Sequence, residues 1–201
     1  MSKIGIMGGT FDPVHLGHIK LAQHARTEFE LEKILFLPNH NQWMKKDREL
    51  TPDIHRLQMV RLAVEDIPGF EVSSAEIEAG GISYTYRTLE ILKKQYPNEI
   101  LYFIMGADSL LTLEHWAEPA RVMKYAHLLA AVRDDCDMAR LNAQKSKLEQ
   151  RYDAQIDLLH MPPVTISSTQ IRKGFYQDSA VRQLLPAKVA SYIVENNLYH
   201  F

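Results

Sequence analysis

A short run near the N-terminus combines residue types that bind phosphate. Gly8 and Gly9 follow an apolar segment and precede residues 10–13, which read Thr-Phe-Asp-Pro. Glycine has no Cβ, so a ligand can approach its backbone closely. A helix is expected to begin near His15, and a helix N-terminus offers unpaired N–H groups and partial positive charge. The run therefore predicts phosphate binding at the start of this helix.

Two histidines lie three residues apart in the same run. On a helix, His15 and His18 share one face, so both side chains can reach the same ligand. The surrounding residues match neither the dinucleotide-binding G-x-G-x-x-G pattern nor a P-loop. A simple turn with a half-buried histidine pair is one alternative, and a metal site with Asp12 as third ligand is another. Both alternatives stay open, but phosphate handling is the favoured interpretation.

A second polar run lies near the other end of the chain. Ser167, Ser168 and Thr169 precede an apolar helical pattern. Their hydroxyl groups are strong helix caps and, with nearby N–H groups, suit a phosphate. Arg172 adds a planar positive charge for the same anion. Judged alone, this segment is better explained as an ordinary capped helix with a surface arginine.

The elements that must position these runs alternate along the chain. Short apolar runs predict strands at 4–7, 34–37, 100–105 and 128–132, with weaker candidates at 70–72 and 156–159. Helical patterns lie between them, at about 15–29, 53–65, 85–95, 119–124, 139–152 and 186–196. This alternation predicts an α/β fold with an open, mainly parallel sheet and helices on both faces. Ligands of such sheets bind beyond the carboxyl ends of the strands, where the first run lies.

Three segments stand apart from this alternation. Residues 38–51 are polar and too long for a tight connection, so they are expected to form a binding loop or a lid. Residues 134–155 are highly charged and are expected to form a peripheral helix or insertion. Residues 166–201 form a C-terminal segment that continues helically. No shift in composition divides the chain, so residues 1–201 are expected to form one domain.

Composition excludes several classes of protein. The 201 residues are 46% hydrophobic and 24% charged, as in soluble globular proteins. With 25 acidic and 23 basic residues the net charge is −2, which argues against binding nucleic acid through bulk positive charge. The single cysteine, Cys136, favours a reducing cytosol. No membrane-spanning run or secretory leader is recognisable, so a cytoplasmic location is expected. The oligomeric state stays open, a homo-oligomer included.

The two polar runs together resemble the signature of the nucleotidylyltransferase superfamily. Residues 15–18 match its H-x-G-H motif, and residues 166–172 read I-S-S-T-Q-I-R, similar to its I-S-S-T-x-I-R motif. Over nearly the whole chain, the resemblance is to bacterial nicotinate-mononucleotide adenylyltransferases. Residues 83–89 are similar to that family's S-Y-T-x-x-T-L segment, and residues 106–116 to its G-x-D…W segment. The resemblance implies a Rossmann-like nucleotidylyltransferase fold.

The resemblance also implies a reaction. The enzyme would transfer AMP from ATP to nicotinate mononucleotide, giving nicotinate adenine dinucleotide (deamido-NAD) and pyrophosphate, with Mg²⁺ accompanying ATP. The attacking phosphate is already ionised near neutral pH, so catalysis reduces to positioning and charge stabilisation. Nicotinamide mononucleotide and phosphopantetheine are alternative acceptors. A nucleotide-binding module without activity and a metal-dependent hydrolase built on Asp12, His15 and His18 are alternatives of other classes.

Individual roles follow from the same resemblance. Catalytic residues would be His15, His18, Lys45 and Arg172. ATP or phosphate would contact Gly8, Gly9, Thr10, Phe11, Gly106, Asp108, Arg133, Ser167, Ser168 and Thr169. Nicotinate mononucleotide would contact Tyr84, Thr85 and Trp116. No protein metal ligand is assigned.

Simple structural roles compete with these assignments, and two segments depart from the family's pattern. Core packing would explain Trp116. A position at the start of a helix would explain Tyr84, and a role as helix N-cap would explain Asp108. The family's P-P-H-K loop is replaced by Gln-Trp-Met-Lys at 42–45, and its Arg-Pro-Gly by Arg-Asp-Asp at 133–135.

Overall fold

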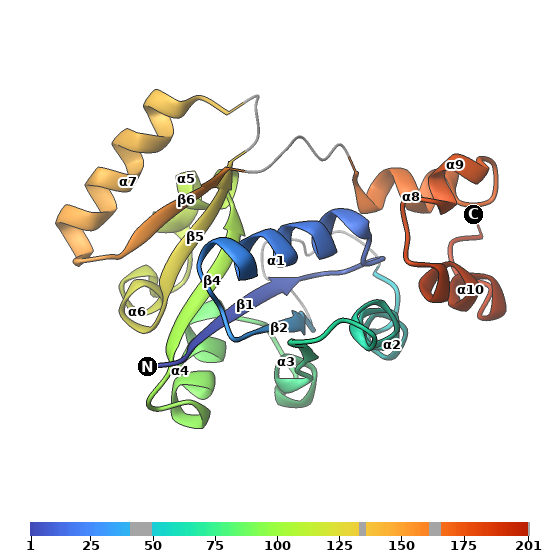
Figure 1. Ribbon diagram of the computed structural model, residues 1–201, viewed down its shortest axis with the longest axis horizontal. Coiled ribbons are helices and arrows are strands. Elements are labelled where there is room, and N and C mark those ends of the chain that lie inside the picture. The colour runs from blue at the N-terminus through green and yellow to red at the C-terminus, as the bar shows by residue number, and fades with distance from the viewer. Residues whose placement is uncertain (41–49, 133–135, 161–165, 201) are drawn as a thin grey trace.

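One parallel sheet forms the centre of the fold (Figure 1). The computed structural model describes residues 1–40, 50–132, 136–160 and 166–200. Its strands are β1 (Lys3–Gly9), β2 (Lys33–Pro38), β3 (Phe70–Val72), β4 (Ile100–Gly106), β5 (His127–Val132) and β6 (Ile156–His160). They lie in the order β3-β2-β1-β4-β5-β6, and every neighbouring pair is parallel. This is the order of the Rossmann fold, so the predicted fold class is confirmed.

Helices cover both faces of the sheet. They are α1 (Leu16–Glu28), α2 (Asp53–Val64), α3 (Ala75–Ala79), α4 (Thr85–Gln95), α5 (Ala107–Thr112), the 3₁₀ turn η2 (Leu113–His115), α6 (Pro119–Tyr125), α7 (Met138–Tyr152), α8 (Ser168–Gly174), α9 (Ser179–Arg182) and α10 (Ala187–Glu195). Side chains alternate across each strand, so the apolar residues of β2 divide between two cores. Ile34 and Phe36 pack with α1, α2 and the C-terminal helices, whereas Leu35 and Leu37 pack with α4, α5 and α6.

The predicted strands and helices are all present, with ends that differ by no more than two residues. Residues 134–155 contain α7, which buries only Leu141 and Leu148 and lies beside β6 at the edge of the sheet, as a peripheral helix should (Figure 1). The C-terminal segment contains α8, α9 and α10. No helix in the described part of the chain is long and apolar enough to span a membrane. The extent of the domain, residues 1–201, stays a prediction.

The arrangement creates one crevice at the carboxyl edge of the sheet. The strand order reverses between β1 and β4, because β2 and β3 extend to one side and β5 and β6 to the other. The connections that follow β1 and β4 therefore leave in opposite directions and leave space between them. Figure 1 shows β1 pointing toward α8, α2 and α10, which gather beyond its carboxyl end.

Candidate active site

The turn after β1 carries the first polar run. Phe11 has a left-handed backbone (φ +48°), and its buried ring packs edge-on against His18 with 5.1 Å between ring centroids. A Cβ on Gly9 would lie only 3.0 Å from the Phe11 ring, which explains why glycine ends the strand. Turns with left-handed residues make neighbouring N–H groups converge into anion-binding hollows. The turn then reaches His15, which is the N-cap of α1, so a helix does begin near His15 as predicted.

The two histidines form a stacked pair. Their ring centroids are 3.7 Å apart, and the backbone N–H of His15 donates to Nδ1 of His18 at 3.1 Å. Because Nδ1 of His18 accepts this hydrogen bond, the neutral ring carries its proton on Nε2 and offers that N–H as a donor. Burial lowers the pKa of His15 to about 4. Burial and the neighbouring His15 hold the pKa of His18 well below its usual value. Both rings are therefore neutral near pH 7.

The second polar run meets the first. Ser167 caps α8, where its Oγ accepts from the N–H of Gln170 at 3.2 Å. The hydroxyl of Ser168 donates to the carbonyl of Pro13 at 3.0 Å. Segments far apart in the sequence thus lie side by side at the carboxyl end of β1.

Arg172 makes the second connection between these runs. Its Nη1 donates to the carbonyl of Asp12 and lies 3.9 Å from the Asp12 carboxylate. Its Nη2 donates to Oγ1 of Thr169 at 3.2 Å. These hydrogen bonds hold the guanidinium between the two polar runs, both of which are predicted to bind phosphate.

The C-terminal segment also fixes the first turn. Tyr199 donates its hydroxyl proton to Oδ1 of Asp12 at 2.8 Å, and both residues are buried. Burial and the adjacent carboxylate raise the pKa of Tyr199, so its hydroxyl stays protonated. Asp12 is thus engaged by Tyr199 and lies near Arg172. The described residues contain no group of three histidine, cysteine or acidic side chains that could hold a metal ion, so they do not support the zinc-type alternative.

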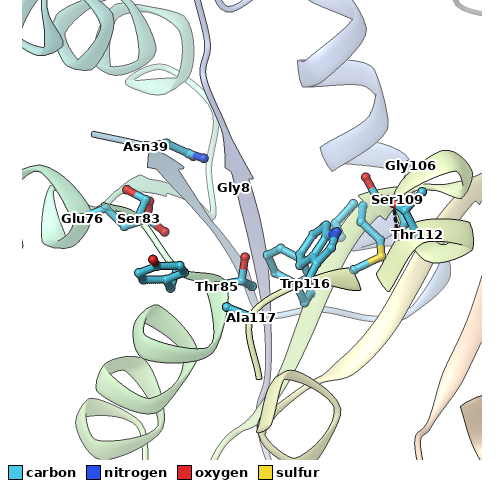
Figure 2. Close-up of a pocket in the computed structure, with 14 residues that line it drawn as sticks. Gly8, Asn39, Glu76, Ser83, Thr85, Gly106, Ser109, Thr112, Trp116 and Ala117 are labelled. Atoms are coloured by element: carbon cyan, nitrogen blue, oxygen red, sulfur yellow. Dashed lines mark hydrogen bonds between the residues drawn. The ribbon is translucent and has the colours of Figure 1, made fainter. Parts of the chain in front are cut away.

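A cavity of about 370 Å³ lies in the crevice beside this turn (Figure 2). Five residues predicted to bind substrates line it, namely Gly8, Tyr84, Thr85, Gly106 and Trp116. The remaining lining residues are Asn39, Glu76, Ser83, Phe103, Ile104, Met105, Ser109, Thr112 and Ala117. Figure 2 shows Glu76, Ser83 and Asn39 on one side of the strand that carries Gly8, and Trp116 and Ser109 on the other.

The cavity offers a flat ring and a helix N-terminus. Trp116 follows η2 and packs edge-on against Phe103, with ring centroids 6.3 Å apart. Its Nε1 is buried and has no partner among the described residues. Tyr84 is the N-cap of α4, and its side chain does not cap the helix, so this helix start presents its positive end at the cavity wall. The arrangement suits a planar ring that bears an anionic group.

Glu76 is a cavity residue that sequence analysis did not identify. Its Oε1 accepts from the hydroxyl of Thr88 at 2.7 Å, while its Oε2 is buried without a partner among the described residues. Burial raises the pKa of Glu76, although hydrogen bonds from Thr88 and Ser83 act in the opposite direction. Asn39, Ser83, Ser109 and Thr112 were also missed. Glu76 lies in a five-residue helix that is too short to show a periodic pattern.

Of three other predicted site residues, Asp108, Lys45 and Arg133, the structure describes only Asp108. Asp108 is the second residue of α5, and the N-cap is Gly106, so the explanation of Asp108 as an N-cap was wrong. Lys45 and Arg133 lie outside the described residues, together with the altered loop segments at 42–45 and 133–135. Their assigned roles stay predictions, as do the roles of the residues that the structure does place.

Comparisons with known proteins agree with this geometry. Residues 6–174 match the family described as cytidylyltransferase-like. A protein of Lachnoclostridium phytofermentans named probable nicotinate-nucleotide adenylyltransferase is 41% identical over 199 residues, which cover 99% of this chain and 100% of that protein. A protein of the same name from Desulfitobacterium hafniense is 41% identical over 98% of this chain and 95% of its own length.

Solved structures show the same fold at lower identity. The nicotinic acid mononucleotide adenylyltransferase of Plasmodium falciparum, solved with APC and with NaAD, aligns with a TM-score of 0.76 and 20% identity. The alignment covers 100% of this chain and 98% of that one. A second structure, from Vibrio parahaemolyticus, aligns with a TM-score of 0.65 and 17% identity over 99% and 96% of the two chains. With the fold, the two joined motifs and the full-length relatives in agreement, the chain belongs to the cytidylyltransferase-like family and, within it, to the nicotinate-nucleotide adenylyltransferases.

Proposed function

We propose that this protein transfers AMP from ATP to nicotinate mononucleotide. An oxygen of the acceptor's 5′-phosphate attacks the α-phosphorus of ATP, and the bond to the β-phosphate oxygen breaks. The products are nicotinate adenine dinucleotide and pyrophosphate. The observation that carries the proposal is the cavity that joins Trp116 and the start of α4 to Gly8. Gly8 is the second-last residue of β1, the strand that the histidine turn follows. The names of the full-length relatives support it.

The phosphate end of the site works by positioning and by charge. The acceptor phosphate is already an anion near neutral pH, so no general base is required. In our proposal Nε2–H of His18 donates to the α-phosphate, where negative charge shifts during transfer. His15 packs on His18, and burial, which is the main cause of the lowered pKa of His18, keeps that ring neutral near pH 7. Backbone N–H groups of the turn at Gly9, Thr10 and Phe11 complete this part of the site.

The late run supplies the remaining charge stabilisation. Ser168, Thr169 and Arg172 lie against the turn after β1, and in our proposal they act on the β- and γ-phosphates, together with Ser167 and Lys45. Arg172 is already oriented by Asp12, so little side-chain entropy is lost when it meets the phosphates. Gly106 and Asp108, at the end of β4, are proposed to contact the adenosine ribose. Arg133, which lies outside the described residues, is proposed to contact the adenine or a phosphate.

The acceptor end of the cavity suits an aromatic acid. The pyridine ring is proposed to stack on Trp116, and its carboxylate to accept from N–H groups at the start of α4, near Tyr84 and Thr85. A carboxylate is therefore favoured over the neutral carboxamide of nicotinamide mononucleotide.

The family suggests a divalent cation, and we propose that it is Mg²⁺. Mg²⁺ usually keeps several waters and binds through substrate phosphates and few protein carboxylates. The described residues fit that mode, since they contain no acidic cluster that would hold an ion by itself. When bound with ATP, Mg²⁺ would neutralise phosphate charge. A cytoplasmic location is proposed from the single cysteine.

ATP labelled at the α-phosphate tests the reaction type. With Mg²⁺ and nicotinate mononucleotide, the label should enter a dinucleotide, and unlabelled pyrophosphate should form in equal amount. The label recovered as free AMP, with or without acceptor, would instead indicate a hydrolase. Tight ATP binding with no labelled product from any acceptor would indicate a nucleotide-binding module and contradict the proposal.

A further inference from the structure

Arg56 is a completely buried arginine that has no role in the site described above. It lies on α2, where its guanidinium forms an ion pair with Asp53. Its Nε donates to the carbonyl of Thr51 at 2.9 Å, and its Nη1 to the carbonyl of Thr10 at 2.7 Å. Its Nη2 also reaches the carbonyl of His40 at 3.3 Å. One guanidinium thus joins three separate segments at the carboxyl edge of the sheet.

Burying the charge of Arg56 is energetically unfavourable, so its contacts must explain why an arginine occupies this position. Removing a guanidinium from water costs several kcal/mol, and ion pairing with one carboxylate does not always offset that cost. The neighbouring buried positions of α2, Met59 and Val60, use apolar side chains for packing. Arg56 differs because the planar fork of arginine offers five donors with fixed directions. Those donors are used on backbone carbonyls of connecting segments.

The bond to Thr10 has a consequence for the next residue. In a trans peptide group, the carbonyl and the following N–H point in opposite directions. The carbonyl of Thr10 points at Arg56, so the N–H of Phe11 points away from it. Phe11 has a left-handed backbone, a conformation that in other turns directs successive N–H groups toward one anion. The orientation of the Thr10–Phe11 peptide group therefore decides whether Phe11 can donate to a phosphate.

We propose that Arg56 is a positioning residue for adenylyl transfer, which holds the Thr10–Phe11 peptide group so that the N–H of Phe11 donates to a phosphate oxygen of ATP. This inference rests on the proposed function. Arg56 itself contacts no substrate and acts only through the backbone. A donor that is fixed before the substrate arrives needs no reorganisation during the reaction, which is how such groups lower a barrier.

The variant Arg56→Lys tests the proposal because lysine keeps the charge but lacks the planar fork. One ammonium group cannot hold three carbonyls in these directions, so kcat should fall by about 10²-fold, the usual effect of a small misplacement. The KM for nicotinate mononucleotide should stay within about twofold of its original value, because the acceptor cavity does not contact Arg56. Arg61→Lys, at an exposed position on the same helix, is the matched control and should leave kcat unchanged.

A spectroscopic signature separates positioning from a general loss of stability. In ¹H–¹⁵N spectra, the Phe11 amide should shift when ATP and Mg²⁺ are added to the unmodified protein or to Arg61→Lys. In folded Arg56→Lys this shift should be strongly reduced. A folded Arg56→Lys protein with the full Phe11 shift and normal kcat would overturn the proposal.

An ATP titration of the unmodified protein can also refute the proposal, so the test does not depend on whether Arg56→Lys folds. If ATP shifts the His18 signals but leaves the Phe11 amide unmoved, Phe11 does not donate to phosphate and the inference is wrong. The titration contains no acceptor, so it is independent of which acceptor reacts. A Phe11 shift that is strongly reduced in folded Arg56→Lys, together with no labelled dinucleotide, would refute the proposed function and retain Arg56 as the residue that positions Phe11 for ATP binding.

Discussion

Arg172 donates a hydrogen bond to the backbone carbonyl of Asp12, which lies 160 residues earlier in the chain. Ser168 makes a parallel connection to Pro13, and Tyr199 binds the Asp12 carboxylate. The turn after β1 is therefore held from outside the sheet by α8 and by the C-terminal residues. The phosphate end of the proposed site depends on both ends of the sequence, and this dependence can be tested one contact at a time.

Loss of the His18 donor should affect the chemical step. In His18→Ala, kcat should fall by about 10²–10³, the usual cost of removing one donor that meets developing charge. His18→Gln retains an N–H donor and should retain more activity. Initial rates of pyrophosphate release give these values, and Gln23→Ala, at an exposed position on the same helix, is the control. Full turnover by folded His18→Ala protein would show that His18 is not the donor.

The histidine pair makes a prediction about pH. The pKa of His15 is about 4 and that of His18 is also lowered, so neither ring titrates between pH 6 and 8. Their protonation should therefore produce no change in kcat across that range. NMR titration of the ring protons gives the pKa directly. A His15 or His18 pKa near 6.5 would contradict the buried, neutral pair.

The same pKa shift predicts the direction of stability with pH. The folded protein keeps His15 neutral, whereas the unfolded chain takes up a proton below pH 6.5, so the free energy of unfolding should fall as pH drops from 6.5 to about 4. The loss from His15 alone amounts to roughly 3 kcal/mol at most. Urea unfolding at several pH values measures it. His15→Gln should show a smaller loss over this interval, and an identical pH dependence would argue against this origin.

Replacing Trp116 should weaken binding of the acceptor and leave ATP binding unaffected. Stacking of a base on an aromatic side chain contributes about 1–3 kcal/mol, so Trp116→Ala should raise the KM for nicotinate mononucleotide by a factor of roughly 5 to 150. Trp116→Phe keeps an aromatic face and should lose less. Steady-state kinetics with each substrate varied in turn separate the two KM values. An equal rise in the KM for ATP would indicate that Trp116 only supports the fold.

Tyr199 should stabilise the turn after β1. Tyr199→Phe leaves Oδ1 of the buried Asp12 without this donor, and such a loss costs about 1–3 kcal/mol. Denaturant unfolding should show the loss, together with a lower kcat because the turn is less firmly held. Tyr152→Phe, on the peripheral helix α7, serves as the control. An unchanged free energy of unfolding in Tyr199→Phe would mean that this hydrogen bond contributes little.

Periodicity predicted most of the fold because the strands are short, apolar and well separated. Residues 100–105 and 128–132 are apolar throughout, so nothing competes with a buried strand there. By contrast, α3 and α5 have five and six residues, too few to show a helical period. Arg56 was missed for a different reason. An arginine in a mixed helical pattern predicts a solvent-facing position, and only tertiary contacts explain its burial.

The candidate site was predictable only in part. The strand ends after β1 and β4 locate the crevice by a general rule of parallel sheets, and Gly8 and Gly106 do line it. The contact between Ser168 and Pro13 cannot be derived from local patterns, because it depends on how the C-terminal helices pack. The family resemblance predicted only that both runs bind the phosphates of ATP. Glu76 enters the cavity from a segment whose local sequence carries no ligand-binding pattern, whereas Asn39 belongs to residues 38–51, which were expected to form a binding loop or a lid.

A comparison of acceptors tests most directly whether this protein transfers AMP to nicotinate mononucleotide. The measurement is kcat/KM for pyrophosphate release with ATP and Mg²⁺, using nicotinate mononucleotide, nicotinamide mononucleotide and phosphopantetheine in parallel. The stacked ring and the helix start at the cavity predict the highest value for nicotinate mononucleotide, with the amide lower and phosphopantetheine inactive. A higher value for either of the other acceptors, or no pyrophosphate with nicotinate mononucleotide, would contradict it.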